Sequence, residues 1–216
     1  MSIRAAIFDL DGTLADTLND IAGAMNRSLR LHGLPEHPVA DYRYMVGNGI
    51  KTLAVRAVGE RRELAQAVQA EYQRYYSAHA LDTAAPYPGI AELLRALVRA
   101  DIAVCVLSNK PHPDTCAVIR HFFPDVPFAV VRGQLPEVPV KPDPTGAQLI
   151  AQELGLAPEV CVYLGDTSVD MRTAVAAGMH PVGVTWGFRT PEELTRSGAA
   201  RLIAHPMELM DFVTLL

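Results

Sequence analysis

The 216-residue sequence predicts an α/β fold, a doubly wound parallel sheet with a helical cap subdomain inserted after the first strand. Short, nearly continuous apolar runs recur along the chain, as expected of strands that are covered on both faces. Segments with the apolar spacing of helices separate several of these runs. One long stretch, between residues 15 and 87, has helical patterns but no convincing strand, which is more than a single crossover connection needs.

Five of the apolar runs are predicted to be parallel strands: Ile3–Leu10, Ile102–Ser108, Phe128–Arg132, Val160–Gly165 and Pro181–Trp186. Three helices are predicted around them: Ile90–Ala100, Thr145–Leu154 and Asp170–Ala177. The last two are followed by glycines, Gly155 and Gly178, where helix C-caps favour them. In such sheets ligands bind beyond the carboxyl ends of the strands, so the site is expected there.

The long helical stretch is predicted to be a separate cap domain, residues 16–83, while residues 1–15 and 84–216 form the α/β core. Three helices are predicted in the cap: Thr17–Leu31, Gly49–Val58 and Glu60–His79. Because the insertion point lies at the carboxyl ends of the strands, we favour a lid that excludes water from the site over a purely structural subdomain.

Composition excludes several classes of partner. The net charge is −5 and no basic block is present, which argues against nucleic acid. The longest apolar stretches are too short to cross a bilayer and the N-terminus lacks a signal-like segment, so we expect a cytoplasmic protein with no membrane partner. The three cysteines lack zinc or disulfide spacing and are expected to be free thiols. A monomer and a homodimer are both compatible with the sequence.

The first predicted strand ends in two acidic residues, Asp9 and Asp11, followed by Gly12. Residues two apart on a strand point the same way, so the two carboxylates are expected to project together. Carboxylates that close repel, and a bound cation or a shared proton would relieve the repulsion. Gly12 has no Cβ, which allows a sharp turn and the close approach of a ligand.

Two later motifs offer groups that bind phosphate. Ser108 and Asn109 close the second strand with a hydroxyl and an amide that can donate hydrogen bonds to phosphate oxygens. Lys141 stands among three prolines, which pre-order its loop. A lysine held in this way suits a phosphoryl group and also compensates nearby carboxylates.

The last motif closes the fourth strand and opens a helix. Asp166 is placed to complete an oxygen-only metal site with Asp9, and Asp170, one turn into the helix, can support it. Magnesium favours carboxylate and water ligands of this kind. An acidic or hydroxyl N-cap explains the same segment, and both roles can hold together.

With these motifs in order, the chain resembles the haloacid dehalogenase superfamily, and within it the phosphoglycolate phosphatase-like enzymes. The resemblance covers nearly the whole chain and rests on residues 9–13, the cap, residues 108–111, Lys141-Pro142, residues 165–167 with Asp170, and residues 186–188. It implies a Rossmann-like core, a Mg²⁺ cofactor, and a small phosphorylated metabolite as the substrate of a phosphomonoester hydrolase.

The resemblance also implies roles for individual residues. Asp9 would be the nucleophile that becomes an aspartyl phosphate, and Asp11 the general acid and then base. Magnesium would be bound by Asp9, the main-chain oxygen of Asp11, and Asp166. The phosphate would be held by Ser108, Asn109 and Lys141, with supporting roles for Thr13 and Asp170.

Departures from related families sharpen the expected reaction. Dehalogenases of the superfamily lack the second aspartate, whereas this chain has Asp11. Sugar phosphomutases tend to carry a histidine where this chain has Ile21. A sugar phosphomutase, a pyrophosphatase and a non-catalytic phosphate- or metal-binding module remain the alternatives. In the cap, Tyr42, Arg43 and Lys51 are candidates to contact the far end of the substrate, and solvated surface positions explain the two cations equally well.

Overall fold

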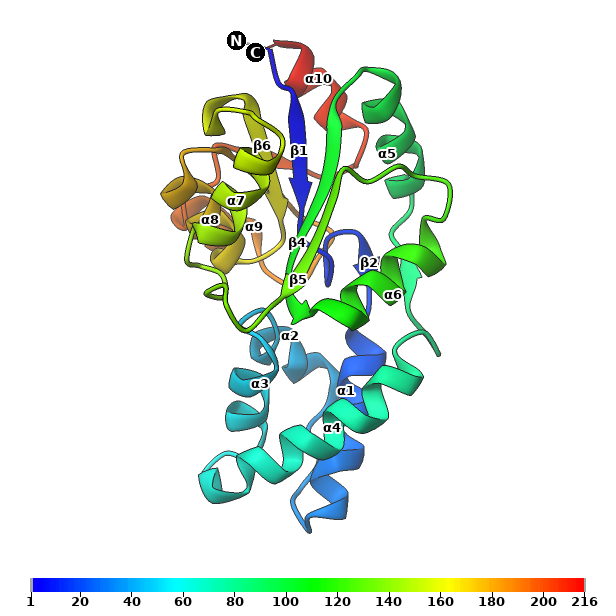
Figure 1. Ribbon diagram of the computed structural model, residues 1–216. Helices are drawn as coiled ribbons and strands as arrows, with labels where there is room; N and C mark the ends of the chain where they lie inside the picture. The colour runs from blue at the N-terminus through cyan, green and yellow to red at the C-terminus, as the bar shows by residue number, and fades with distance from the viewer. Residues whose placement is uncertain (1, 216) are drawn as a thin grey trace.

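A computed structural model describes residues 2–215 of the chain, with a parallel sheet at its centre (Figure 1). Six strands pair in the order β5-β4-β1-β6-β7-β8, and every neighbouring pair is parallel. Their bounds are β1 Ala5–Phe8, β4 Ala103–Pro111, β5 Val130–Gln134, β6 Cys161–Gly165, β7 His180–Val184 and β8 Arg201–Ile203. The predicted doubly wound α/β sheet is therefore confirmed.

Helices cover both faces of the sheet because successive residues of each strand point to opposite faces. In β1, Ala6 and Phe8 pack with α5 (Ile90–Arg99), α6 (His112–Phe122) and α10 (Glu208–Leu215). Ala5 and Ile7 pack on the other face with α7 (Thr145–Glu153) and α8 (Ser168–Ala177). The short helix α9 (Pro191–Arg196) contacts β7 and β8. Continuous apolar strands follow directly from this two-sided burial.

Four helices lie beyond the carboxyl ends of the strands, in the lower half of Figure 1. They are α1 Leu18–Leu31, α2 Tyr42–Met45, α3 Ile50–Ala57 and α4 Ala65–His79, with 3₁₀ turns at Val39–Asp41 and Arg62–Leu64. They bury an apolar cluster of their own, to which the α/β part contributes Phe188. A two-stranded antiparallel ribbon, β2 (Ala15–Asp16) with β3 (Ala85–Pro86), lies where the chain enters and leaves this helical part.

The structure differs from the sequence prediction in several elements. The helix predicted at 60–79 begins only at Ala65, after the 3₁₀ turn. The strand β8 and the helices α6, α9 and α10 were not predicted, because each is short or lacks clear periodicity. The second strand runs on to Pro111, so that Ser108, Asn109 and Lys110 belong to the strand itself. Across residues 2–215, none of the helices has both the length and the apolar character needed to cross a membrane.

Candidate active site

The sheet order brings the predicted residues to one edge. Asp9 directly follows β1, Ser108 to Lys110 end β4, and Asp166 directly follows β6. Because β4 and β6 flank β1 in parallel, their carboxyl ends meet around Asp9. The backbone N–H of Asp9 donates to the carbonyl of Leu164 at 2.9 Å, which fixes where the chain turns away from the sheet.

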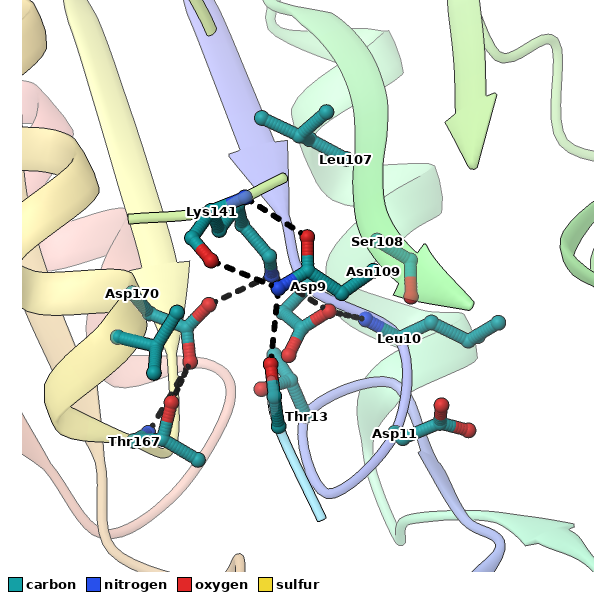
Figure 2. A network of polar contacts seen from close by, with 12 residues as sticks. Asp9, Leu10, Asp11, Thr13, Leu107, Ser108, Asn109, Lys141, Thr167 and Asp170 are labelled. Atoms are coloured by element: carbon teal, nitrogen blue, oxygen red, sulfur yellow. Dashed lines mark hydrogen bonds and ion pairs between the residues drawn. The ribbon is translucent and has the colours of Figure 1, made fainter. Parts of the chain in front are cut away.

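Asp9 shares a buried lysine with Asp170 (Figure 2). The Lys141 ammonium lies 2.9 Å from Asp9 Oδ1 and 2.7 Å from Asp170 Oδ1, and all three side chains are buried. The backbone N–H of Leu10 also donates to Asp9 Oδ1 at 2.7 Å. Burial, and then the negative charge of Asp170, raise the pKa of Asp9 to about 7. Lys141 opposes this rise but does not cancel it.

Asp166 is fully buried next to this pair. Its oxygens accept hydrogen bonds from Thr13 Oγ1 at 3.2 Å and from the backbone N–H of Phe188 at 2.7 Å. Burial raises the pKa of Asp166 well above its usual value, and the charges of Asp170 and Asp9 raise it further. Two glycines make room for this carboxylate: a Cβ on Gly12 would lie 2.3 Å from its Oδ2, and a Cβ on Gly187 2.3 Å from its Cβ.

The donor set of this cluster fits a hard divalent cation. Carboxylate oxygens of Asp9, Asp166 and Asp170 lie within 4.8 Å of one another, and the Lys141 ammonium pairs with those of Asp9 and Asp170. Three buried carboxylates against one ammonium leave negative charge that a cation would offset. Asp170 accepts three hydrogen bonds, from Lys141 at Oδ1 and from Thr167 N and Oγ1 at Oδ2, one more than Asp166 accepts. Asp9 and Asp166 are therefore the carboxylates best placed to bind a metal.

Asn109 fixes the loop that carries Lys141. Its Oδ1 accepts from the backbone N–H of Lys141 at 2.8 Å, and its Nδ2 donates to the Lys141 carbonyl at 3.0 Å. The same Nδ2 donates to the carbonyl of Gly47, in the helical part, at 2.9 Å. The amide predicted to bind phosphate thus positions the lysine and connects the two parts of the chain.

Ser108 lies on a stretch of β4 that is released from regular pairing. The register with β5 shifts between Leu107 and Pro111, a bulge-like irregularity. Ser108 is buried, its Oγ accepts from the backbone N–H of Lys110 at 3.2 Å, and it lines the pocket described below together with Asp9. Its hydroxyl proton is therefore available to donate to a ligand beside Asp9.

Asp11 does not point into the Asp9 cluster, as Figure 2 shows. Both of its carboxylate oxygens accept from Lys110 Nζ at 2.9 Å, and Oδ1 also accepts from Thr17 Oγ1 at 2.6 Å. The two carboxylates, expected to project together, therefore have different partners in this structure. Each has its own lysine, Lys141 for Asp9 and Lys110 for Asp11.

A pocket lies between the α/β part and the helical part. Asp9, Asp11, Ser108 and Asn109 line it from one side, and residues of α1, α3 and α4 with the 46–49 loop line it from the other. Sequence reasoning missed three of its groups: Lys110, quoted within a motif but given no role, Tyr72 and Tyr76. The tyrosines carried no signal, because helical spacing marks them only as core residues.

The cap residues expected to contact substrate do not line this pocket. Tyr42 is buried inside the helical cluster, where its hydroxyl donates to Asn26 Oδ1 at 2.6 Å. Arg43 and Lys51 are exposed to solvent. Their positions agree with the alternative given above, that the two cations are solvated surface charges.

Comparison with known proteins agrees with this geometry. The family model for haloacid dehalogenase-like hydrolases matches residues 3–178. A phosphoglycolate phosphatase of Cereibacter sphaeroides is 33% identical over 96% of each chain. An N-acetylmuramic acid 6-phosphate phosphatase of Pseudomonas aeruginosa is 28% identical over 98% of this chain and 95% of that protein. The crystal structure of a predicted phosphoglycolate phosphatase from Haemophilus somnus has a TM-score of 0.90 at 26% identity, covering 98% of both chains. The resemblance drawn from the motifs is confirmed, and the chain belongs to the haloacid dehalogenase-like hydrolases.

Proposed function

We propose that this chain is a magnesium-dependent phosphomonoester hydrolase that acts on a small phosphorylated metabolite through an aspartyl phosphate on Asp9. The observation that best supports this function is the buried cluster at the end of β1, in which the Asp9 carboxylate lies 2.9 Å from the Lys141 ammonium and beside Asp166. A carboxylate, an ammonium and a second carboxylate are the parts needed to attack phosphorus and to offset the charge that gathers there.

The relatives support a phosphate monoester as the substrate. The Cereibacter sphaeroides relative is named a phosphoglycolate phosphatase, and the Pseudomonas aeruginosa relative is named for a phosphorylated amino sugar. The former is the more similar in sequence, so 2-phosphoglycolate is the first ester to test. A sugar phosphomutase or a pyrophosphatase would use the same buried group and is separated by its products.

Mg²⁺ would be held by Asp9, Asp166 and the main-chain oxygen of Asp11. When bound, it supplies positive charge that offsets the nucleophile and the phosphate oxygens. Asp170 has a different role, because its oxygens already accept hydrogen bonds from Lys141 and Thr167. It holds the lysine in place.

In the first step, a carboxylate oxygen of Asp9 attacks phosphorus and the bond from phosphorus to the ester oxygen breaks. Lys141 and the hydroxyl of Ser108 hold the phosphoryl oxygens, and Asn109 keeps Lys141 in position through both of its backbone groups. Asp11 donates its proton to the departing alkoxide, which leaves as the free alcohol. The step requires Asp11 to exchange Lys110 and Thr17 for the substrate oxygen.

In the second step, Asp11 takes a proton from a water molecule that attacks the phosphorus of the aspartyl phosphate. The bond from phosphorus to the Asp9 oxygen breaks and inorganic phosphate is released. Residues 16–83 act as the cap over residues 1–15 and 84–216, and the contact from Asn109 to Gly47 holds that cap against the site. Closure keeps water away until the alcohol has left.

The test is phosphate release from 2-phosphoglycolate with Mg²⁺, with EDTA, and in two variants. Asp9→Asn is expected to lower kcat by about 10⁴-fold or more, the usual scale for loss of a nucleophile. Asp125→Asn, at an exposed aspartate outside the site, is the matched control and is expected to keep full activity. Full activity of Asp9→Asn, or hydrolysis that EDTA does not reduce, would contradict the proposal.

A further inference from the structure

Successive backbone carbonyls at the end of α2 accept hydrogen bonds from side chains, because the last carbonyls of a helix lack partners within it. They belong, in order, to Tyr44, Met45, Val46 and Gly47. Arg56, within the helical part, donates to the first two at 3.4 and 2.8 Å. The α/β part supplies the donors to the other two, Arg189 Nη2 at 3.2 Å and Asn109 Nδ2 at 2.9 Å. The 44–49 loop is therefore held from both parts of the chain.

Arg189 reaches this loop from the segment that follows β7. Its side chain is only 8% exposed, and its guanidinium lies 3.4 Å from the Glu193 carboxylate and 5.1 Å from the centroid of the Tyr44 ring. Its Nη1 has no hydrogen-bond partner within residues 2–215, so burying this charge carries a cost. Arginine is almost never buried unless it is paired, so the contact with the loop of the other part is a specific one.

The segment that carries Arg189 also holds the Asp166 carboxylate. The backbone N–H of Phe188 donates to Asp166 Oδ2 at 2.7 Å, while the Phe188 side chain is buried in the apolar cluster of the helical part. Gly187 packs against Asp166 so closely that an added Cβ would lie 2.3 Å from the Cβ of that residue. A movement of the 44–49 loop that takes Arg189 and Phe188 with it would therefore displace a donor to Asp166.

We propose that Arg189 is a positioning residue, which clasps the 44–49 loop over the site and couples the position of that loop to Asp166 through Phe188. Arg189 does not line the pocket, whereas Phe188 and residues of the loop do, so it acts through them. The inference rests on the proposed function only for the binding of a cation at Asp166. Such coupling is reciprocal: a cation that fixes Asp166 favours the closed loop, and the closed loop favours the cation.

The experiment uses trypsin, because cleavage after the exposed Lys51 requires the loop and the start of α3 to open. In EDTA, Arg189→Met is expected to be cleaved there about 10-fold faster than wild type, the scale of one hydrogen bond from a charged donor. Mg²⁺ is expected to slow this cleavage about fivefold or more in wild type and less than about twofold in Arg189→Met. Each rate is divided by the rate at Arg62, an exposed site beyond the other end of α3, which removes effects on the whole fold.

Arg196→Met, at an exposed arginine of α9, is the matched control and is expected to keep the wild-type rates with and without Mg²⁺. Unchanged cleavage of Arg189→Met in EDTA would overturn the clasp. Equal slowing by Mg²⁺ in Arg189→Met and wild type, or no slowing in wild type, would overturn the coupling to Asp166. These outcomes leave the proposed hydrolysis intact because none of them measures turnover. Hydrolysis of no ester by the wild type would reject the proposed function and leave the proteolysis result standing.

Discussion

Replacing Lys141 by methionine tests the charge balance of the site. Its ammonium lies 2.9 Å from Asp9 Oδ1 and 2.7 Å from Asp170 Oδ1. At an effective dielectric constant of about 20, each contact corresponds to about 6 kcal/mol of Coulomb attraction, much of which is offset by the cost of burying the ammonium. Breaking a buried pair by removing one partner costs about 3–5 kcal/mol, and we expect Lys141→Met to lower the free energy of unfolding by that amount.

The loss should depend on pH because Asp9 can take up a proton. Its pKa, raised from 3.8 to about 7, means that the folded protein holds a proton that the unfolded chain has already released. The metal-free wild type therefore loses stability as pH rises from about 4 to about 7. In Lys141→Met the uncompensated charge is smallest when Asp9 is protonated, so the loss is expected to be smaller at pH 5 than at pH 8.

The assay is urea unfolding in EDTA, followed by fluorescence of the single tryptophan, Trp186, whose indole N–H donates to the Thr13 carbonyl at 3.0 Å. Lys51→Met, at an exposed lysine of α3, is the matched control and is expected to stay within about 0.5 kcal/mol of wild type. An unfolding free energy of Lys141→Met within about 1 kcal/mol of wild type at pH 8 would refute the role given to this lysine.

Close packing and burial lead to three further predictions, two for substitutions and one for thiol labelling. Gly187→Ala is expected to cost about 3 kcal/mol or more, because its Cβ would lie 2.3 Å from the Cβ of Asp166, and a wild-type melting temperature would contradict this. Gly23→Ala, within α1 and with no heavy atom within 4 Å of the added Cβ, is expected to stabilise by about 1 kcal/mol and to raise Tm by about 2–4 °C; a lower Tm would count against it. A thiol reagent is expected to label the half-buried Cys116 first, because burial raises the pKa of Cys105 to about 12 and that of Cys161 to about 11. Equal labelling rates for all three thiols would contradict this.

The parallel sheet could be predicted from local patterns because two-sided burial makes the strands apolar throughout. Ile3–Leu10 and Val160–Gly165 were predicted within a few residues of β1 and β6 on that basis. β8, with three residues, is too short for its composition to stand out from a loop. The helix α6 begins at His112, directly after the residues that close the second strand, and its sequence lacks a clear helical spacing of apolar residues.

Most of the candidate site could also be predicted, because strand ends are visible in the sequence and parallel strands bring them together. Asp9, Ser108 and Asp166 lie at one edge, as expected. The role of Asn109 could not be predicted. Its side chain faces the loop of Lys141 and the carbonyl of Gly47, and no local pattern shows which of two polar groups contacts a ligand and which holds a neighbouring loop.

The sequence by itself determined the fold class, the family and the charged groups gathered at the strand ends, because these depend on residue types and on their order along the chain. The tertiary structure decided how the charges pair. Asp11 pairs with Lys110, 99 residues away in the chain, and Asp9 with Lys141, whereas strand alternation alone placed the two carboxylates together. It also left the buried hydroxyl of Tyr76 without a hydrogen-bond partner among residues 2–215. Side-chain direction after a strand ends is set by contacts between distant segments, and the order of residues does not record them.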